Sequence, residues 1–211
     1  MERGAVFADR ADAGRRLAVL VRHAVPDVDV VCGIPRGGIV VAAEVATAIG
    51  APLRAIVARK VGAPDHPELA LGAVGPGGAV VLNRDLAHRA GADAAFLDRV
   101  VADARAEVDA RLAALPGVAP PAEVAGRTVL VVDDGVATGA TAQAVGQWLA
   151  MTAAARRVLA LPVAPADAIP RLRADYDDVV VLETPPGFVA VGQWYRDFRQ
   201  VPDDEVARRL A

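Results

Sequence analysis

The stretch VLVVDDGVATGAT, from Val129 to Thr141, decides the fold that this sequence predicts. Four apolar, mostly β-branched residues predict a buried strand, and Asp133 and Asp134 follow at its end. A short turn of Gly and Thr leads into AQAVGQWLA, which predicts the first turns of a helix. Because backbone N–H groups and the helix dipole at such a helix start favour an anion, the stretch predicts a site for a phosphorylated sugar.

The side chains of this loop suit the same ligand. Thr138 and Thr141 add hydroxyl donors, and Gly139 lets the backbone approach closely. Asp133 and Asp134 can accept hydrogen bonds from sugar hydroxyls or reach Mg²⁺. A Walker A loop is excluded because the stretch has no lysine. A response-regulator receiver domain, which VLVVDD also suggests, would leave the TGAT segment without a role.

The stretch closely resembles the phosphoribosyl-pyrophosphate (PRPP) motif of type I phosphoribosyltransferases. The resemblance implies that Asp133 and Asp134 are catalytic residues that bind the ribose hydroxyls, and that both are candidates for contact with Mg²⁺. It also implies that the following loop binds the 5′-phosphate of PRPP, through Val136, Ala137, Thr138, Gly139, Ala140 and Thr141.

A second strand–loop–helix unit contains the sequence GIPRGG, from Gly33 to Gly38. Two glycines expose backbone N–H groups and Arg36 adds a fork of donors, so the loop can bind an anion, although it can also be no more than a glycine-rich turn. In the resembling family this loop binds pyrophosphate and often contains a non-proline cis peptide, for which the Pro35–Arg36 bond is the candidate. The implied pyrophosphate-binding residues are Pro35, Arg36, Gly37, Gly38, Arg59 and Lys60, with Arg36 and Lys60 also catalytic.

Two segments between these motifs are expected to cover the site. Residues 61–78 are rich in Gly and Pro and predict a long loop, which in related enzymes is a lid; His66 and Glu68 are candidate contributors. Residues 83–117 form an insertion with a long helix over 93–115, whose apolar residues recur at helical spacing. The insertion can be a small cap, a dimer surface or a helix packed on the core.

The C-terminal segment 183–200 holds half of the eight aromatic residues and resembles the hood of hypoxanthine-type phosphoribosyltransferases. The resemblance implies that Phe188 or Trp194 stacks on a base and that Asp197 contacts Mg²⁺. Two features depart from that type: Ala137 stands where those enzymes carry an aspartate, and the strand LALPVAP lacks their purine-reading lysine. The acceptor base therefore stays open.

Composition indicates one globular domain over residues 1–211, because 54% of the residues are hydrophobic and 23% are charged. A net charge of −3 does not favour a nucleic-acid partner, and we expect no membrane partner because no long apolar run is present. A single cysteine, Cys32, and no signal peptide indicate a cytoplasmic protein. Lys60 is the only lysine beside 22 arginines, which suggests a specific use for its compact ammonium.

The alternation of strands and helices predicts an α/β fold: a parallel sheet with helices on both faces, Rossmann-like, plus a small helical and C-terminal hood. Strands are expected over 28–32, 53–58, 79–82, 129–132, 157–163 and 179–182, and helices over 7–25, 39–49, 93–115, 165–174 and 201–211. The implied activity is Mg²⁺-dependent transfer of phosphoribose from PRPP to a small-molecule acceptor. The alternative is a non-catalytic PRPP or nucleotide sensor of the same fold, and family precedent makes a homodimer an option.

Overall fold

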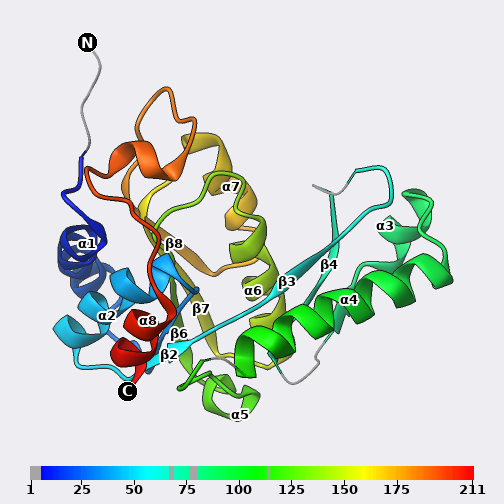
Figure 1. The fold of residues 1–211 in the computed structure, drawn as a ribbon, viewed down its shortest axis with the longest axis horizontal. Helices are drawn as coiled ribbons and strands as arrows, with labels where there is room; N and C mark the ends of the chain where they lie inside the picture. The colour runs from blue at the N-terminus through cyan, green and yellow to red at the C-terminus, as the bar shows by residue number, and fades with distance from the viewer. Residues whose placement is uncertain (1–5, 67–68, 77–79, 114) are drawn as a thin grey trace.

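The computed structural model describes residues 6–66, 69–76, 80–113 and 115–211. A parallel sheet of five strands forms the centre of the molecule (Figure 1). Its order is β2 (Leu53–Ala55), β1 (Val30–Gly33), β6 (Thr128–Val132), β7 (Arg156–Val163) and β8 (Asp178–Glu183). All neighbouring pairs run parallel, so the predicted α/β class is confirmed.

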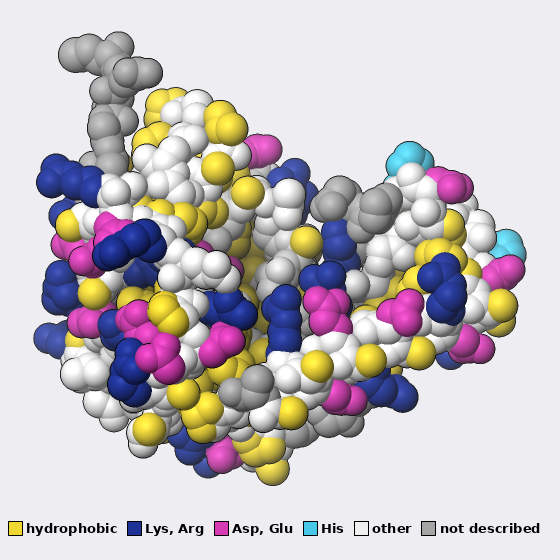
Figure 2. Space-filling view, in the orientation of Figure 1, with side chains coloured by type: hydrophobic (Ala, Val, Ile, Leu, Met, Phe, Trp, Pro, Cys, Tyr) yellow, Lys and Arg dark blue, Asp and Glu magenta, His cyan; other side chains and the backbone are white. Residues whose placement is uncertain are grey.

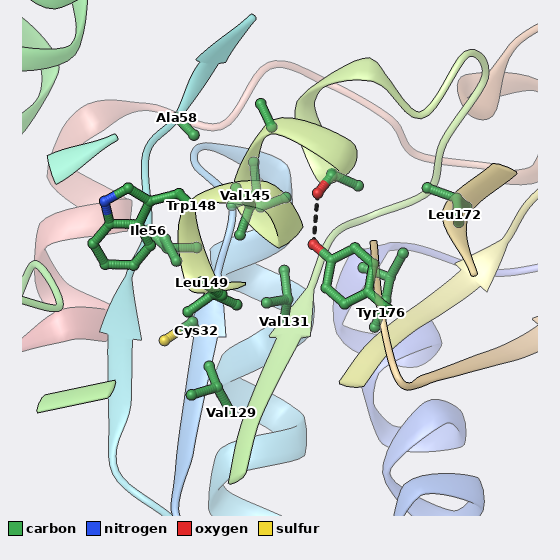
Figure 3. Close-up of a cluster of buried hydrophobic side chains, with 14 of the residues drawn as sticks. Cys32, Ile56, Ala58, Val129, Val131, Val145, Trp148, Leu149, Leu172 and Tyr176 are labelled. Atoms are coloured by element: carbon green, nitrogen blue, oxygen red, sulfur yellow. Dashed lines mark hydrogen bonds between the residues drawn. The ribbon is translucent and has the colours of Figure 1, made fainter. Parts of the chain in front are cut away.

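Helices cover both faces of this sheet because its strands are apolar on both sides. Leu130 and Val132 of β6 face the helices α1 (Arg10–Ala24) and α2 (Gly37–Ile49). Val129 and Val131, which alternate with them, face α6 (Ala140–Met151) and the short helix α7 (Ile169–Leu172), as Figure 3 shows for part of this cluster. Alternate residues of one strand thus bury against opposite helix layers.

Short elements complete the body around the sheet. Helix α8 (Asp203–Leu210) packs against α2 and β2 through Val206, which is fully buried. Other short elements of the described chain are α5 (Pro121–Val124) and the 3₁₀ turns Ala166–Ala168 and Val191–Trp194. No helix in the described ranges is both long and apolar enough to cross a membrane.

The loop predicted over residues 61–78 is wrong for residues 61–62 and 70–74, which lie in strands, and residues 67–68 and 77–78 lie outside the described ranges. Strands β3 (Arg59–Gly62), β4 (Ala70–Val74) and β5 (Val80–Leu82) form a separate antiparallel sheet in that order. Small residues such as Ala73 and Gly72 carry little β-propensity, so cross-strand pairing and burial decide the structure here. His66 is exposed, and Glu68 lies outside the described residues.

The insertion covers this second sheet. Helices α3 (Arg84–Arg89) and α4 (Ala94–Ala113) pack on it through a separate apolar cluster that includes Val61, Leu71, Ala104 and Val108. In Figure 1 the unit projects to the right of the parallel sheet, with α4 lying along β3. The long helix is therefore confirmed, and it forms a layer over the antiparallel sheet beside the main body.

Candidate active site at the edge of the parallel sheet

Two loops meet where neighbouring parallel strands end. β1 pairs with β6, with Gly33 opposite Val132, so the loops that follow both strands leave the same edge of the sheet. The N–H of Ile34 donates a hydrogen bond to the carbonyl of Val132, at 2.9 Å. The GIPRGG loop and the acidic pair therefore start side by side, at the edge where open α/β sheets bind ligands.

Two glycines let these loops approach each other. A Cβ on Gly37 would lie 1.9 Å from Oδ2 of Asp134, and a Cβ on Gly38 would lie 2.8 Å from the carbonyl oxygen of Val132. Both distances are too short for any real side chain, so the close approach requires glycine at both positions. The peptide bond between Pro35 and Arg36 is cis, as expected.

Residues 135–142, which lead into α6, surround a small hollow. Gly139 precedes α6 with φ of +79°, a conformation that other residues adopt only at a cost. The hollow has a volume of about 140 Å³ and lies at the N-terminus of α6, where unpaired N–H groups favour an anion. All six residues predicted to bind the 5′-phosphate line it, together with Asp133, Gly135 and Ala142.

The two aspartates are held in an environment that resists their ionisation. Burial, and then the neighbouring Asp134, raise the pKa of Asp133 well above its usual range. Burial also raises the pKa of Asp134, against the lowering effect of a hydrogen bond from Arg10. The backbone N–H of Asp134 donates to Oδ1 of Asp133 at 2.9 Å, so the Asp133 side chain is held against the backbone of Asp134.

Arg10, the first residue of α1, is a site residue that sequence reasoning missed. Its Nε lies 2.7 Å from Oδ2 of Asp134, and both side chains are mostly buried, with 11% and 15% exposed. Its guanidinium also donates to the carbonyl of Arg199 at 2.8 Å and lies 3.8 Å from the ring centroid of Phe198. Nothing in the local pattern of α1 indicates this role, because the partners are more than 120 residues away in the chain.

The hood is anchored to the same aspartate. The hydroxyl of Tyr195 donates a hydrogen bond to the backbone carbonyl of Asp134. The Tyr195 ring packs between Phe7 and Phe198, with centroids 5.2 Å and 4.9 Å away. This bond attaches the segment 183–200 to the backbone of the acidic pair.

The two residues predicted to stack on a base differ in exposure. Trp194 is only 5% exposed in the aromatic cluster of the hood, and its Nε1 has no hydrogen-bond partner within the described part of the chain. Phe188 is half-buried and lies 6.0 Å from Trp194 between ring centroids. Phe188 is therefore the better placed of the two to meet a ligand, with Trp194 packed behind it.

Arg36 lines a larger cavity. Its Nε lies 2.8 Å from Oδ1 of Asp203 at the start of α8. A cavity of about 500 Å³ lies beside Arg36 and Gly37 and is closed on its far side by α4, through residues that include Glu107 and Arg111. The insertion therefore supplies one wall of the space next to the GIPRGG loop.

The structure does not place Arg59 and Lys60 in that cavity. Both line a separate cavity of about 330 Å³ between β3 and α4. Arg59 forms an ion pair with Glu107, with 2.8 Å between Nε and Oε2, and Glu107 lines both cavities. Figure 2 shows the charged side chains of both signs that gather along α4 and the adjoining strand.

Asp197 lies apart from the acidic pair. Its carboxylate accepts three hydrogen bonds from the guanidinium of Arg199, and these chiefly lower its pKa. It lines a cavity of about 400 Å³ with Asp9 and Arg10. Within the described residues no three Asp, Glu, His or Cys side chains are grouped closely enough to hold a metal ion, so Asp197 does not join Asp133 and Asp134 in one cluster.

Comparisons with known proteins agree with this geometry. A model of the phosphoribosyl transferase domain matches residues 9–198. The Mycobacterium tuberculosis proteins MT0597 (strain CDC 1551 / Oshkosh) and Rv0571c (strain H37Rv) carry provisional names as phosphoribosyl transferases. Each is 44% identical to this chain over 205 residues, covering 97% of this chain and 46% of its own length. This chain thus spans about half the length of these curated relatives.

A solved structure agrees over nearly the whole chain. The crystal structure of TT1426 from Thermus thermophilus superposes with a TM-score of 0.88, at 42% identity, over 97% of both chains. The two loops at the edge of the sheet lie within the range that the family model matches. This chain belongs to the phosphoribosyl transferase domain family.

Proposed function

We propose that this domain transfers the phosphoribosyl group of PRPP to a nitrogen nucleophile and releases pyrophosphate. The observation that carries the proposal is the meeting of three parts at one edge of the sheet. These are the acidic pair Asp133 and Asp134, the hollow at the start of α6, and the GIPRGG loop packed against Asp134 through Gly37. In the proposal these parts bind the ribose, the 5′-phosphate and the pyrophosphate of one ligand, in that order.

Each part has a distinct role in the proposed reaction. The phosphate hollow holds the 5′-phosphate through backbone N–H groups and the hydroxyls of Thr138 and Thr141. Asp133 and Asp134 accept hydrogen bonds from the ribose hydroxyls while positive charge develops at C1. Arg36 and the N–H groups of Gly37 and Gly38 stabilise the charge that grows on the departing pyrophosphate. Catalysis in this scheme comes from positioning and electrostatics.

The proposed site suits Mg²⁺ that binds together with PRPP. The two adjacent carboxylates of Asp133 and Asp134 are oxygen ligands of the kind that Mg²⁺ prefers. Two carboxylates do not complete an octahedral shell, so phosphate oxygens of the substrate and water would supply the remaining ligands. When bound, Mg²⁺ neutralises charge on the leaving pyrophosphate.

The acceptor is proposed to be a nitrogen heterocycle bound under the hood. Phe188 is half-buried at this position, and the neighbouring Val189 is 82% exposed, so the hood presents an apolar surface at its tip. Ala137 offers no carboxylate to take a proton from the acceptor, so an acceptor that ionises in solution, or loses its proton to water, suits this site.

The second candidate is a sensor that binds PRPP or a nucleotide without turning it over. Arg36 is paired with Asp203 and Arg59 with Glu107, so two of the cations proposed for pyrophosphate already have carboxylate partners. The curated relatives are about twice as long as this chain, so in proteins of that length a sensor domain would have a further part of the chain to regulate.

Incubation with PRPP, Mg²⁺ and a pool of purines, pyrimidines and related heterocycles tests the proposal, with products identified by mass spectrometry. We expect one phosphoribosylated product, the loss of one base and the release of pyrophosphate. The variant carrying both Asp133→Asn and Asp134→Asn should abolish the product while its circular dichroism stays native. Binding of PRPP without any product would favour the sensor, and full turnover by the double variant would refute the site.

A further inference from the structure

Arg10 has an environment unlike that of the other arginines near the start of α1. Arg15 and Arg16 are at least half exposed, whereas the Arg10 side chain is only 11% exposed. Burying a guanidinium is unfavourable unless its charge and its N–H groups are satisfied. Here a carboxylate, a backbone carbonyl and the face of an aromatic ring together satisfy it.

The three partners of Arg10 come from the two parts of the site that the chain must bring together. Asp134 belongs to the acidic pair, and Phe198 and Arg199 belong to the end of the hood segment. Helix α1 fixes the position of the Arg10 backbone in two ways. Leu17 is fully buried against the sheet, and Asp9 caps the helix by accepting a hydrogen bond from the N–H of Asp12, at 2.7 Å.

The contact also decides where the Asp134 carboxylate lies. Nε of Arg10 binds Oδ2 of Asp134, and this same oxygen is the atom that a Cβ on Gly37 would strike. The space beside Gly37 is thus occupied by a carboxylate oxygen and by the Arg10 Nε that holds it, which would lie 2.7 Å from the same Cβ. An aspartate without this bond could rotate away from the ribose-facing position, since its χ angles cost little to change.

We propose that Arg10 is a positioning residue that holds the Asp134 carboxylate in the orientation in which it accepts ribose hydroxyls. The inference rests on the proposed function, because it takes the acidic pair as the part of the site that recognises ribose. Arg10 itself is assigned no contact with the substrate.

The test uses ligands that separate the parts of the site. Ribose 5-phosphate and 2-deoxyribose 5-phosphate differ only in one hydroxyl, and inorganic pyrophosphate reports the GIPRGG loop alone. Each is titrated calorimetrically into the wild-type protein and the variants Arg10→Gln and Arg10→Lys, without Mg²⁺, because in the proposed function Mg²⁺ would link the acidic pair to pyrophosphate. Arg16→Gln is the matched control, because Arg16 also lies on α1, pairs with Asp12 and packs over an aromatic ring, that of Phe7.

We expect the wild type and Arg16→Gln to prefer ribose 5-phosphate over its 2-deoxy analogue by roughly tenfold or more, the ratio for one hydrogen bond to a charged group. Arg10→Gln should lose most of this preference, and Arg10→Lys, which keeps the charge, should retain an intermediate part of it. Affinity for pyrophosphate should stay the same in all four proteins. A merely structural role would weaken all ligands in parallel and would not change the ratio between the two sugars.

Two results would overturn the inference while leaving the proposed function intact. In one, Arg10→Gln keeps the wild-type preference between the two sugars. In the other, Arg10→Gln weakens pyrophosphate as much as ribose 5-phosphate, which would make Arg10 a direct anion ligand. If the wild type itself shows no preference, the ribose-reading role of the acidic pair fails, and the role of Arg10 fails with it. Should Arg10→Gln not fold, Arg10→Lys decides, because an undiminished preference in that variant would exclude a need for the guanidinium geometry.

Discussion

The hydroxyl of Tyr195 donates a hydrogen bond to the backbone carbonyl of Asp134. Tyr195 lies in the hood and Asp134 lies at the end of the central strand β6, so this bond joins the cover of the site to its acidic pair. The Phe7 and Phe198 rings on either side of Tyr195 keep its own ring in place. Aromatic contacts, this hydroxyl and backbone hydrogen bonds such as that from the N–H of Arg196 to the carbonyl of Phe7 together hold the hood in place.

Tyr195→Phe tests that relationship. The ring contacts survive the change, but the carbonyl of Asp134 loses its donor, so we expect the free energy of unfolding to fall by about 1–2 kcal/mol. Urea denaturation measures this loss, and ribose 5-phosphate should bind a few times more weakly. Tyr176→Phe is the control: Tyr176 donates to the carbonyl of Ala142 at 2.6 Å on α6, so it should lose similar stability without changing the preference between the two sugars. Unaltered stability in Tyr195→Phe would show that the hydroxyl is dispensable.

Gly37→Ala should damage the site more than the fold. Its Cβ would lie 1.9 Å from Oδ2 of Asp134 and 2.7 Å from Nε of Arg10, so the ion pair must move. We expect a loss of about 1–3 kcal/mol in stability, as for overpacking elsewhere, together with at least a tenfold weaker affinity for PRPP. Calorimetric titration of PRPP measures the second effect.

Gly50→Ala provides the comparison for that variant. Gly50 ends α2 with φ of +72°, and nothing lies within 4 Å of an added Cβ. We expect Gly50→Ala to lower the free energy of unfolding by about 1 kcal/mol through backbone conformation alone. Gly50 lies at the opposite end of α2 from the GIPRGG loop. Equal effects of the two substitutions on PRPP affinity would contradict the role assigned to Gly37.

The central architecture could be read from the sequence because it depends on local patterns. Apolar runs such as Val129–Val132 specify buried strands, and the Gly and Thr residues after Asp134 specify a tight loop before a helix. The hollow lined by residues 135–142 and the cis peptide before Arg36 agree with those expectations.

Other parts depend on contacts between distant segments and left no local signal. The contact of Arg10 with Asp134 spans 124 positions, and an arginine at the start of a helix gives no indication of its partner. The high Gly and Pro content of residues 61–78 predicts a loop, yet pairing of β3, β4 and β5 and burial under α4 form a sheet there. Tertiary packing overrides weak strand propensity in such segments.

Asp133→Asn and Asp134→Asn should change stability by different amounts, because only Asp134 is paired with Arg10. Burial raises the pKa of Asp133 above its usual value of 3.8, so the folded state holds this proton more tightly than the unfolded state does. The resulting stability is complete at pH values below 3.8 and is lost as pH rises through the folded-state pKa. Asparagine stays neutral, so we expect Asp133→Asn to gain stability over the wild type, by an amount that grows with pH.

The neighbouring substitution removes the partner of a buried cation instead. Asp134→Asn leaves the Arg10 guanidinium without its carboxylate, but it also removes a carboxylate whose burial raises its pKa despite that bond. The two effects oppose each other, so at neutral pH we expect a loss well below the roughly 3 kcal/mol for breaking a buried ion pair. Denaturant unfolding of both variants and the wild type from about pH 4 to about pH 8 measures these differences in the free energy of unfolding. A pH-independent effect of Asp133→Asn would indicate that its carboxyl is not held in a desolvated environment.

Glu107→Gln tests whether the insertion controls a cation of the site. Glu107 of α4 pairs with Arg59 at 2.8 Å and with Arg111 at 3.5 Å, and it lies between the cavity beside Arg36 and the cavity that Arg59 and Lys60 line. Releasing Arg59 should cost less than about 1 kcal/mol in stability, because the pair is partly exposed. If Arg59 serves pyrophosphate, the released side chain should strengthen pyrophosphate binding by about threefold, within the range for one exposed charge pair.

Asp103→Asn separates this effect from a general change of charge on α4. Asp103 lies one turn away on the same helix, lines the cavity with Arg59 and Lys60, and is within 3.9 Å of Arg99 rather than of Arg59. Asp103→Asn removes the same unit of negative charge as Glu107→Gln, so the long-range attraction of the protein for pyrophosphate should rise equally in both variants. Only Glu107→Gln should give the additional gain in affinity, measured by calorimetry at low and at high salt. Identical gains would mean that Arg59 does not reach pyrophosphate and that α4 acts through its overall charge.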